Sequence, residues 1–396
     1  MKKVYRLLGL VMALLMLLTG CQQGNSNTPG GGVSTESPYD QRDTVRVGLV
    51  CSRTGNKKVN GDFIFEAATL AVEEINAAGG VLGKQVELVV EDEMETQQDA
   101  INAVNRLLSN GDITALAGCV VSTNAIAVSP SIAQYQVPML AMGSSYHIVE
   151  EENPFMWQTR VTDDKVGELF ADAAVNFLGM KNPAILNSTD SFGQGLADST
   201  MAALEKMGIE PAIVVKFNVG EKQFVPFLTQ IVNSGADGVI ASASESALIM
   251  TQVYDMGLME DLTFIGSGGF IGSWGRATAG EAANGWYGCN DWADNVQREE
   301  GIRFTEAYKE RWGRDIVDMV AAASYDSIHL ICEAIEIAGT ADPIKVNDAL
   351  GQIKDHPGAL CTQTAQESHS FGTQYLLVQT RDGAATAIDT LDVPVS

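Results

Sequence analysis

Apolar residues follow two alternating periods along the chain from about residue 44 onward. Residues 45–50 form a short apolar run typical of a strand. After it, Ile64, Ala68, Ala71 and Ile75 recur at helical spacing until Gly79-Gly80 ends the helix. Up to residue 142 the same pattern predicts further strands at 85–91, 113–118 and 137–142 and helices at 97–108 and 122–134.

A second run of the same kind follows Asp163. The pattern predicts helices at 165–178, 193–207, 224–233 and 247–256, and strands at 183–187, 212–217, 238–243 and 263–266. Alternating strands and helices of this length form parallel sheets that are covered on both faces. We therefore predict an α/β fold with two doubly wound parallel-sheet lobes.

The C-terminal part holds too few strands for a third sheet. The pattern predicts helices at 302–312, 320–339 and 344–353 and a strand pair at 375–379 and 384–388, turning at Asp382-Gly383. These elements must complete the first two lobes, so the chain crosses between the lobes more than once. Ligands of doubly wound sheets bind at the carboxyl ends of the strands. Two such lobes facing each other would enclose a cleft.

The N-terminus is basic, then apolar, and then reaches a cysteine. Lys2, Lys3 and Arg6 precede an apolar run at 7–18, which as a helix of about 18 Å is too short for the roughly 30 Å hydrocarbon core. Residues 1–20 are therefore expected to be an export signal. Thr19-Gly20 before Cys21 resembles the lipobox of bacterial lipoproteins, which implies that Cys21 is lipidated. The alternative is a soluble secreted protein with a cysteine there by chance.

Residues 21–43 would then be a flexible tether, because they contain little apolar surface and much Gly, Ser, Asn and Pro. Two or more acyl chains give stable anchoring. The expected location is extracytoplasmic, on the cell membrane through the lipid on Cys21 alone.

Charge and cysteine usage narrow the functional classes. Lys and Arg number 25 against 50 Asp and Glu, a formal net charge of −25, which disfavours nucleic-acid binding. The four histidines are scattered and no CxxC spacing occurs, so no metal site is expected. Cys51 and Cys119 each follow a predicted strand and could form a disulfide; the other interpretation is that both are buried thiols.

Enzyme motifs are missing from the positions where the fold would need them. The turn after the first strand, residues 51–56, lacks the G-x-G-x-x-G pattern, and Gly266-Ser267-Gly268-Gly269 is not followed by the Lys of a P-loop. There is no G-x-S-x-G elbow, and no histidine has an evident nucleophile in a known catalytic spacing. We therefore expect no catalytic residue and no cofactor.

Hydroxyl side chains follow two predicted strands of the first lobe. Ser122 and Thr123 begin a helix, and Ser144 and Ser145 follow the next strand. Such residues ordinarily cap helices. The functional alternative is a small anion site, in which the hydroxyls and the free N–H groups of a helix start hold a carboxylate.

From about residue 44 to 390 the chain resembles the type I periplasmic binding proteins of the branched-chain amino acid uptake family. The motifs that carry the resemblance are Val47-Gly48-Leu49 with Thr54-Gly55, the run from Leu70 to Gly83, Val137-Pro138-Met139, Asp190-Ser191-Phe192-Gly193-Gln194-Gly195, and Tyr325-Asp326-Ser327 with Glu333-Ala334-Ile335 and Ala338-Gly339.

The resemblance implies two lobes joined by three hinge crossings, which close on a small solute and present it to the permease subunits of an ABC importer. The expected division is 44–162 with 291–357 for the first lobe and 163–290 with 358–396 for the second. The resemblance also implies that the carboxylate of the solute is held by Ser122, Ser144 and Ser145.

The other half of the expected pocket departs from the family pattern. Asn60 replaces an aromatic residue of the first long loop, Phe192 replaces a tyrosine, and Gly268 occupies the position of the acid that would pair with an ammonium. A buried ammonium without a carboxylate is costly. Glu245 is the nearest substitute, with Asp291 and Asp190 behind it.

These departures leave the ligand open. A branched-chain amino acid or related small carboxylate is the first expectation. An amide, a urea-like solute or an aromatic carboxylate is the alternative, as is a ligand-sensing ectodomain for a separate membrane partner. Trp286 and Trp292, near a crossing, could line the cleft or pack the hinge.

Overall fold

The computed structural model describes residues 37–150, 153–314 and 317–393. The expected export signal, Cys21 and the first part of the tether lie outside the described residues. Within the described part of the chain, no helix is both long and apolar enough to cross a membrane.

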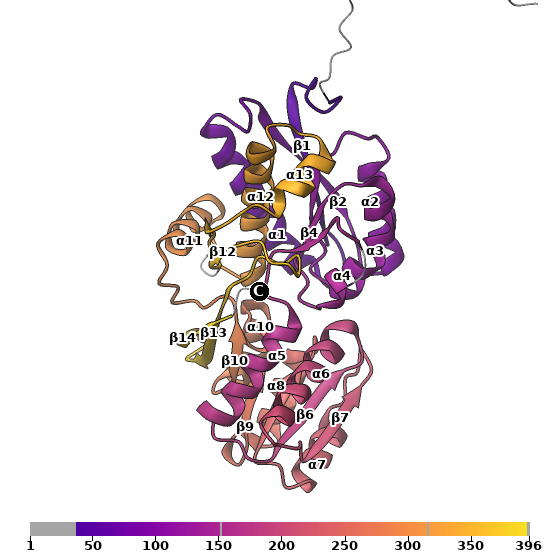
Figure 1. The fold of residues 1–396 in the computed structure, drawn as a ribbon. Helices are drawn as coiled ribbons and strands as arrows, with labels where there is room; N and C mark the ends of the chain where they lie inside the picture. The colour runs from indigo at the N-terminus through magenta and orange to yellow at the C-terminus, as the bar shows by residue number, and fades with distance from the viewer. Residues whose placement is uncertain (1–36, 151–152, 315–316, 394–396) are drawn as a thin grey trace, which may run out of the picture. The chain divides into compact units, whose positions relative to one another are not determined.

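The first sheet has five strands, and all of their pairings are parallel. Its strands are β1 (Thr44–Cys51), β2 (Gln85–Asp92), β3 (Ala115–Gly118), β4 (Met139–Ala141) and β5 (Met156–Gln158), in the order β2-β1-β3-β4-β5 (Figure 1). The helices around it are α1 (Lys58–Ala77), α2 (Gln97–Leu108), α3 (Ser122–Tyr135), α4 (His147–Glu150), α11 (Glu299–Trp312), α12 (Met319–Ala338) and α13 (Pro343–Leu350). Nearly every strand and long helix predicted here is confirmed to within a few residues.

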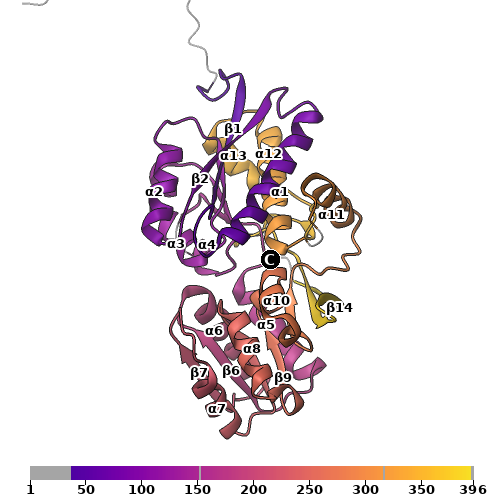
Figure 2. The ribbon, with the colours of Figure 1, turned by 180° about the vertical axis from the view of Figure 1, so that it is seen from behind.

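The second sheet contains a five-strand core built in the same way. Its strands are β6 (Pro183–Ser188), β7 (Ile213–Phe217), β8 (Gly238–Ser242), β9 (Thr263–Gly266) and β10 (Tyr287–Asn290), in the order β10-β9-β8-β6-β7, all parallel. In both sheets the strand that comes first in the chain lies between the second and the third: β1 lies between β2 and β3, and β6 lies between β7 and β8. The main helices around this sheet are α5 (Asp163–Asp172), α6 (Ser191–Lys206), α7 (Val225–Asn233), α8 (Ser246–Asp255), α9 (Gly268–Ile271) and α10 (Ser273–Ala279) (Figure 2).

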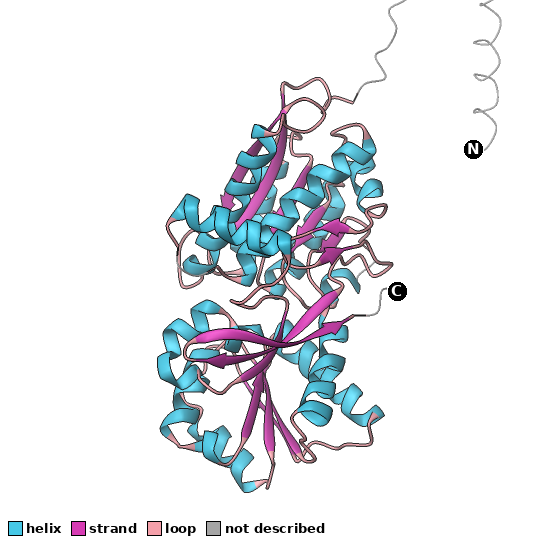
Figure 3. Cartoon of the chain, turned by 90° about the vertical axis from the view of Figure 1, so that its left-hand side faces the viewer, coloured by secondary structure: helices cyan, strands magenta, loops and turns pink. Residues whose placement is uncertain are grey.

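An antiparallel hairpin extends the second sheet. β13 (Gln374–Arg381) pairs antiparallel with β10 and with β14 (Ala384–Asp392), so this sheet has seven strands and is not parallel throughout (Figure 3). The turn falls at Asp382-Gly383, as the sequence predicts. Asp382 and Gly383 both adopt positive φ, which suits the tight turn between the two strands.

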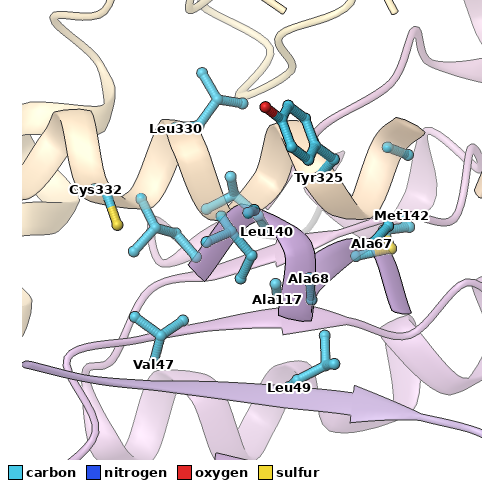
Figure 4. Close-up of a cluster of buried hydrophobic side chains, with 14 of the residues drawn as sticks. Val47, Leu49, Ala67, Ala68, Ala117, Leu140, Met142, Tyr325, Leu330 and Cys332 are labelled. Atoms are coloured by element: carbon cyan, nitrogen blue, oxygen red, sulfur yellow. The ribbon is translucent and has the colours of Figure 1, made fainter. Parts of the chain in front are cut away.

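The alternation of side chains along the first sheet divides its core between two faces. Val47 and Leu49 of β1 pack toward α1 and α12, together with Ala67, Ala68 and Cys332 (Figure 4). Val50 of the same strand packs on the opposite face, in the cluster formed with α2 and α3. Both faces are buried, which explains why the strands read as continuous apolar runs rather than alternating ones.

The chain crosses between the two lobes three times, at residues 159–162, 291–298 and 372–373. The third crossing differs from the expected division at residue 358. Ala359, Leu360 and Phe371 pack in the core of the first lobe, and Ser370 forms a bridge with Gln158 at the end of β5. The intervening strands β11 (His356–Pro357) and β12 (Thr362–Gln363) pair only with each other.

Several short elements show no apolar period in the sequence and were not predicted. β5 and β10 have three and four residues, and α4, α9 and α10 have four to seven, too few to establish a period. The helix predicted at 165–178 is α5, which starts at Asp163 and continues into a π-helical turn at Ala173–Phe177. Two 3-10 turns lie at Leu258–Glu260 and Gly280–Ala283.

The described cysteines carry no disulfide. Cys51 and Cys119 lie at the ends of the adjacent strands β1 and β3, but both are free, buried thiols. Burial raises the pKa of Cys51 to about 12, so this thiol is protonated. The buried-thiol interpretation is therefore the one that the structure supports.

Candidate ligand-binding site

A cavity of about 110 Å³ lies at the carboxyl ends of strands from both sheets. The first lobe contributes residues that follow β1, β3 and β4, and the second contributes residues that follow β6, β8 and β9. Arg160 of the first crossing and Tyr375 of β13, which follows the third crossing, also line the cavity. This is the position that the topology of doubly wound sheets predicts for a ligand.

Two hydroxyl-bearing residues of the first lobe, Ser122 and Ser144, line this cavity. Ser122 is the first residue of α3, where backbone N–H groups have no partner within the helix. Its Oγ accepts a hydrogen bond from the backbone N–H of Ser145 at 3.3 Å. Ser144, the residue before Ser145, also lines the cavity. Gln158 fixes this loop, because its Nε2 donates to the carbonyls of Gly143 at 2.8 Å and Ser145 at 3.1 Å.

Gly143 permits the close approach of the two hydroxyl-bearing segments. A Cβ at this position would lie 3.0 Å from Oγ of Ser122 and 2.9 Å from Ile148. A side chain at residue 143 would therefore push the loop away from the start of α3.

Arg160 is a buried cation that joins the first two crossings to β13. Its Nε and Nη2 donate to the two carboxylate oxygens of Asp291, the second at 3.2 Å. Nη2 also lies 3.3 Å from the hydroxyl of Tyr375 and 3.5 Å from Sδ of Met319. Burial acts to lower the pKa of Arg160, but the Asp291 carboxylate outweighs it and the pKa is raised. The guanidinium therefore stays charged.

Asp163, the first residue of α5, is a second buried charge-bearing group in the lining. Its backbone N–H donates to the carbonyl of Ser144 at 2.8 Å, and its carboxyl group is hydrogen-bonded with the Ser144 side chain. Burial raises the pKa of Asp163 to about 7, although the Ser144 hydrogen bond and the charge of Arg160 oppose this rise. Its Oδ2 is buried and has no hydrogen-bond partner among the described residues.

Two other buried carboxyl groups contrast with Asp163, because a donor lies at each of their oxygens. Glu93 accepts from Ser52 at 3.2 Å on one oxygen and from Asn124 at 3.3 Å on the other. Asp326 accepts from the backbone N–H groups of Ala359 at 2.7 Å and Leu360 at 3.0 Å. Burial raises the pKa of both groups to about 7, yet each has a donor on both oxygens. Asp163 is thus the one of these three whose oxygen is available to a bound molecule.

The structure brings together five of the eight predicted site residues. Asn60, Ser122, Ser144, Phe192 and Gly268 line the cavity. Thr123, Ser145 and Glu245 are not among the lining residues. Ser145 instead supports Ser122 and donates through its own hydroxyl to the carbonyl of Ser191 at 3.4 Å.

The substitute acids expected from the sequence are engaged elsewhere. One oxygen of Glu245 accepts from the backbone N–H of Gly220 at 2.7 Å; the other is buried without a hydrogen-bond partner among the described residues, but Glu245 does not line the cavity. Asp190 lines the cavity, but its Oδ1 caps α6 by accepting from Gly193 at 2.9 Å. Asp291 holds Arg160.

The position expected to carry the acid is a crowded glycine. A Cβ at Gly268 would lie 3.0 Å from Met319 and 3.3 Å from Oδ1 of Asn290. Trp286 and Trp292 do not line the cavity either. Trp286 stacks on Phe270 in the second core and Trp292 packs against Phe304 in the first.

Sequence reasoning missed Lys57, Arg160, Asp163, Trp274 and Tyr375, which all line the cavity. One signal was present. Arg160 and Asp163 closely follow the apolar run 155–157, and charged residues directly after a strand mark the carboxyl end of a sheet. The run was too short to be recognised as a strand.

These groups can bind and orient a solute, because hydroxyls, an acid and apolar walls converge on one space. In the part of the chain that the structure describes, no cluster of three or more His, Cys, Asp or Glu side chains could hold a metal ion.

A small cavity built from the strand ends of two α/β lobes defines a two-lobed solute-binding protein. The chain belongs to the periplasmic binding protein family, whose model matches residues 44–385.

Known relatives support this membership. The chain is 28% identical over 342 residues to an amino acid binding protein from Pseudomonas aeruginosa, covering 82% of this chain and 85% of that protein. It is 26% identical over 311 residues to a leucine-, isoleucine-, valine-, threonine- and alanine-binding protein from the same organism, covering 78% and 82%.

Solved structures share the fold. A leucine-binding protein from Thermotoga maritima is similar at a TM-score of 0.81 with 22% identity, covering 88% of this chain and 99% of that one. A solute-binding protein of an ABC transporter from Rhodopseudomonas palustris, in complex with p-hydroxybenzoic acid, is similar at 0.81 with 22% identity, covering 89% and 98%.

The Arg160–Asp291 pair yields a stability prediction. Asp291→Asn leaves a buried guanidinium without its counter-charge, which should lower the free energy of unfolding by about 3–5 kcal/mol. Replacing both partners, in Arg160→Met with Asp291→Leu, should recover part of that loss. Urea unfolding followed by circular dichroism measures both.

The exposed pair Lys206–Glu168 provides the control, with 71% and 52% of the two side chains exposed. Lys206→Met should change the free energy of unfolding by no more than about 1 kcal/mol. An Asp291→Asn protein as stable as the Lys206→Met protein would contradict the role given to the buried pair.

Proposed function

We propose that the protein is an extracytoplasmic solute-binding lipoprotein of an ABC importer, which binds a branched-chain amino acid or a related small carboxylate. The single observation that carries this proposal is the cavity itself, which is lined by polar groups of both lobes. The relatives named for amino acid binding support the class of ligand. Anchoring through Cys21 and delivery to permease subunits are parts of the same proposal.

The first lobe would hold the carboxylate of the solute. The hydroxyls of Ser122 and Ser144 face the same space, and the start of α3 adds unpaired N–H groups and the positive end of the helix dipole. Hydrogen bonds to a charged acceptor are stronger than neutral ones, so this end of the cavity favours an anion.

Asp163 would receive the ammonium group in place of the acid that Gly268 cannot supply. Its free Oδ2 is the acceptor that supports this assignment, and Asp163 is already linked to Ser144. An α-amino acid has its carboxylate and ammonium on one carbon, so adjacent sites for the two groups fit this class of solute.

A bound solute that contacts both lobes stabilises the arrangement in which the lobes are closed around it. The crossings are the segments about which such a motion would occur, and the ligand shifts the equilibrium by its differential affinity for the two states. No bond is made or broken.

An aromatic carboxylate is the second candidate. The cavity is lined by Phe170 and Phe192 and by the ring of Tyr375, which suit a flat apolar ring. Solved relatives with this fold include one in complex with p-hydroxybenzoic acid.

Thermal unfolding of the purified protein tests the proposal. Leucine, isoleucine and valine should raise the melting temperature by a few degrees, because a ligand at one hundred times its Kd adds about 2.7 kcal/mol to folding stability. Benzoate and p-hydroxybenzoate test the aromatic carboxylate as ligand, and acetamide and urea test an amide or urea-like solute. If no amino acid and no small carboxylate shifts the melting temperature, the proposed function is wrong.

Ser122→Ala should weaken the binding of every carboxylate ligand by about tenfold, because it removes one hydrogen bond to a charged group. Calorimetric titration measures the Kd. Thr123→Ala is the matched control, since its side chain is at the same helix start but does not line the cavity. An unchanged Kd in Ser122→Ala would remove Ser122 from the site.

Asp163→Asn should raise the Kd for leucine tenfold or more, which corresponds to about 1.4 kcal/mol of binding free energy. The Kd for 4-methylpentanoate, which lacks the amino group, should stay the same. Asp164→Asn is the control, because Asp164 is the exposed neighbour. A carboxyl group with a pKa of about 7 is largely ionised at pH 8 and largely protonated at pH 6. Leucine affinity in the wild type should therefore fall from pH 8 to pH 6. Equal losses for both ligands in Asp163→Asn would indicate a structural role instead.

A further inference from the structure

A second, larger chamber adjoins the cavity. It has a volume of about 460 Å³ and lies between the start of α1 and α10. Lys57, Asn60, Ser244 and Trp274 line both spaces, so these four residues form the boundary between them. A solute held by Ser122 and Asp163 in the inner cavity would therefore meet Lys57 at this boundary.

The lining of the outer chamber is unusual for so acidic a protein. The chain has 50 acidic residues against 25 basic ones, yet none of the residues that line this chamber is acidic and its charged lining residue is Lys57. Clefts lined by one sign of charge concentrate ligands of the opposite sign. The outer chamber therefore favours an anionic group.

Lys57 is placed to make a direct contact with such a group. It is half-buried, and among the described residues no carboxylate lies within ion-pair distance of it. Its Nζ lies 5.8 Å from the centroid of the Trp274 ring, which belongs to α10 of the other lobe. The neighbouring Lys58, in contrast, is exposed and paired with Asp62.

The remaining walls suit a short aliphatic stem. Val59 and Trp274 offer apolar surface, while Asn60 and Thr278 offer uncharged hydrogen-bonding groups. An isobutyl or isopropyl side chain directed here would offer the Lys57 ammonium no counter-charge, whereas a carboxylate would. A side chain of a few methylenes that ends in a carboxylate would use both kinds of wall.

We propose that the solute is an acidic α-amino acid, whose distal carboxylate enters the outer chamber and pairs with Lys57. This inference rests on the proposed function and names the ligand within the class of small carboxylates. Ser122 and Ser144 hold the α-carboxylate, Asp163 holds the ammonium, and Lys57 selects the side chain. Trp274 meets Lys57 from the second lobe, so the contact brings together residues of both lobes around the bound solute.

Isosteric ligand pairs isolate the charge of the side chain. Calorimetric titration of the whole protein with glutamate and glutamine, and with aspartate and asparagine, compares each acid with its amide of the same shape. The wild type should bind at least one acid about tenfold more tightly than its amide, as expected for a hydrogen bond to a charged group. This preference should shrink as the salt concentration rises, because the outer chamber is open to solvent.

Lys57→Gln should abolish the preference for the acid, so that acid and amide bind with the same Kd. Lys58→Gln removes the same charge one residue away and should keep the preference of the wild type. Circular dichroism of both variants checks that each is folded.

The outcomes separate this inference from the proposed function. If leucine binds the wild type and neither acid is preferred over its amide, Lys57 does not select the solute and the inference is wrong, while the proposed function stands. An acid preference that survives in Lys57→Gln also overturns the inference. If no amino acid and no small carboxylate binds, both proposals are wrong.

Discussion

The buried pair of Arg160 and Asp291 is the constraint on which the rest of the molecule depends. A guanidinium removed from water must keep its counter-charge, and here the two groups belong to different crossings. Tyr375, from the segment that follows the third crossing, bonds to the same guanidinium. One charge therefore fixes three separate stretches of chain where the two lobes meet, and Arg160 also forms part of the cavity wall.

The position of the cavity follows from a topology that occurs twice. In each lobe the first strand of the set lies between the second and third, and the loops after these strands diverge to opposite faces of the sheet. The loops leave space at the carboxyl end of the sheet, and the small residues Gly143 and Gly268 keep that space open. The polar groups inside it come from at least seven segments, none of which could form a site by itself.

The charged and polar groups around this space are unevenly distributed. Hydroxyls and a helix start occupy one side, the free oxygen of Asp163 lies beside them, and Lys57 stands at the boundary with the outer chamber. Other buried carboxyl groups, Glu93 and Asp326, have both oxygens bonded within the protein and serve to hold loops. The same chemical group thus stabilises the fold in two places and is left available in a third.

The sequence by itself determined the long elements and the α/β class, because apolar periodicity is a local signal, and it placed Ser122 and Ser144 after strands that end at the cavity. It could not determine the third crossing, since residues 359–371 stay with the first lobe through packing and through long-range hydrogen bonds, such as those of Ala359 and Leu360 to Asp326. The sequence also did not reveal that Arg160, Asp163 and Lys57 line one cavity. The role of each depends on whether its charge is paired within the protein. Such pairs join residues more than a hundred positions apart, such as Arg160 and Asp291, which meet only in the folded chain.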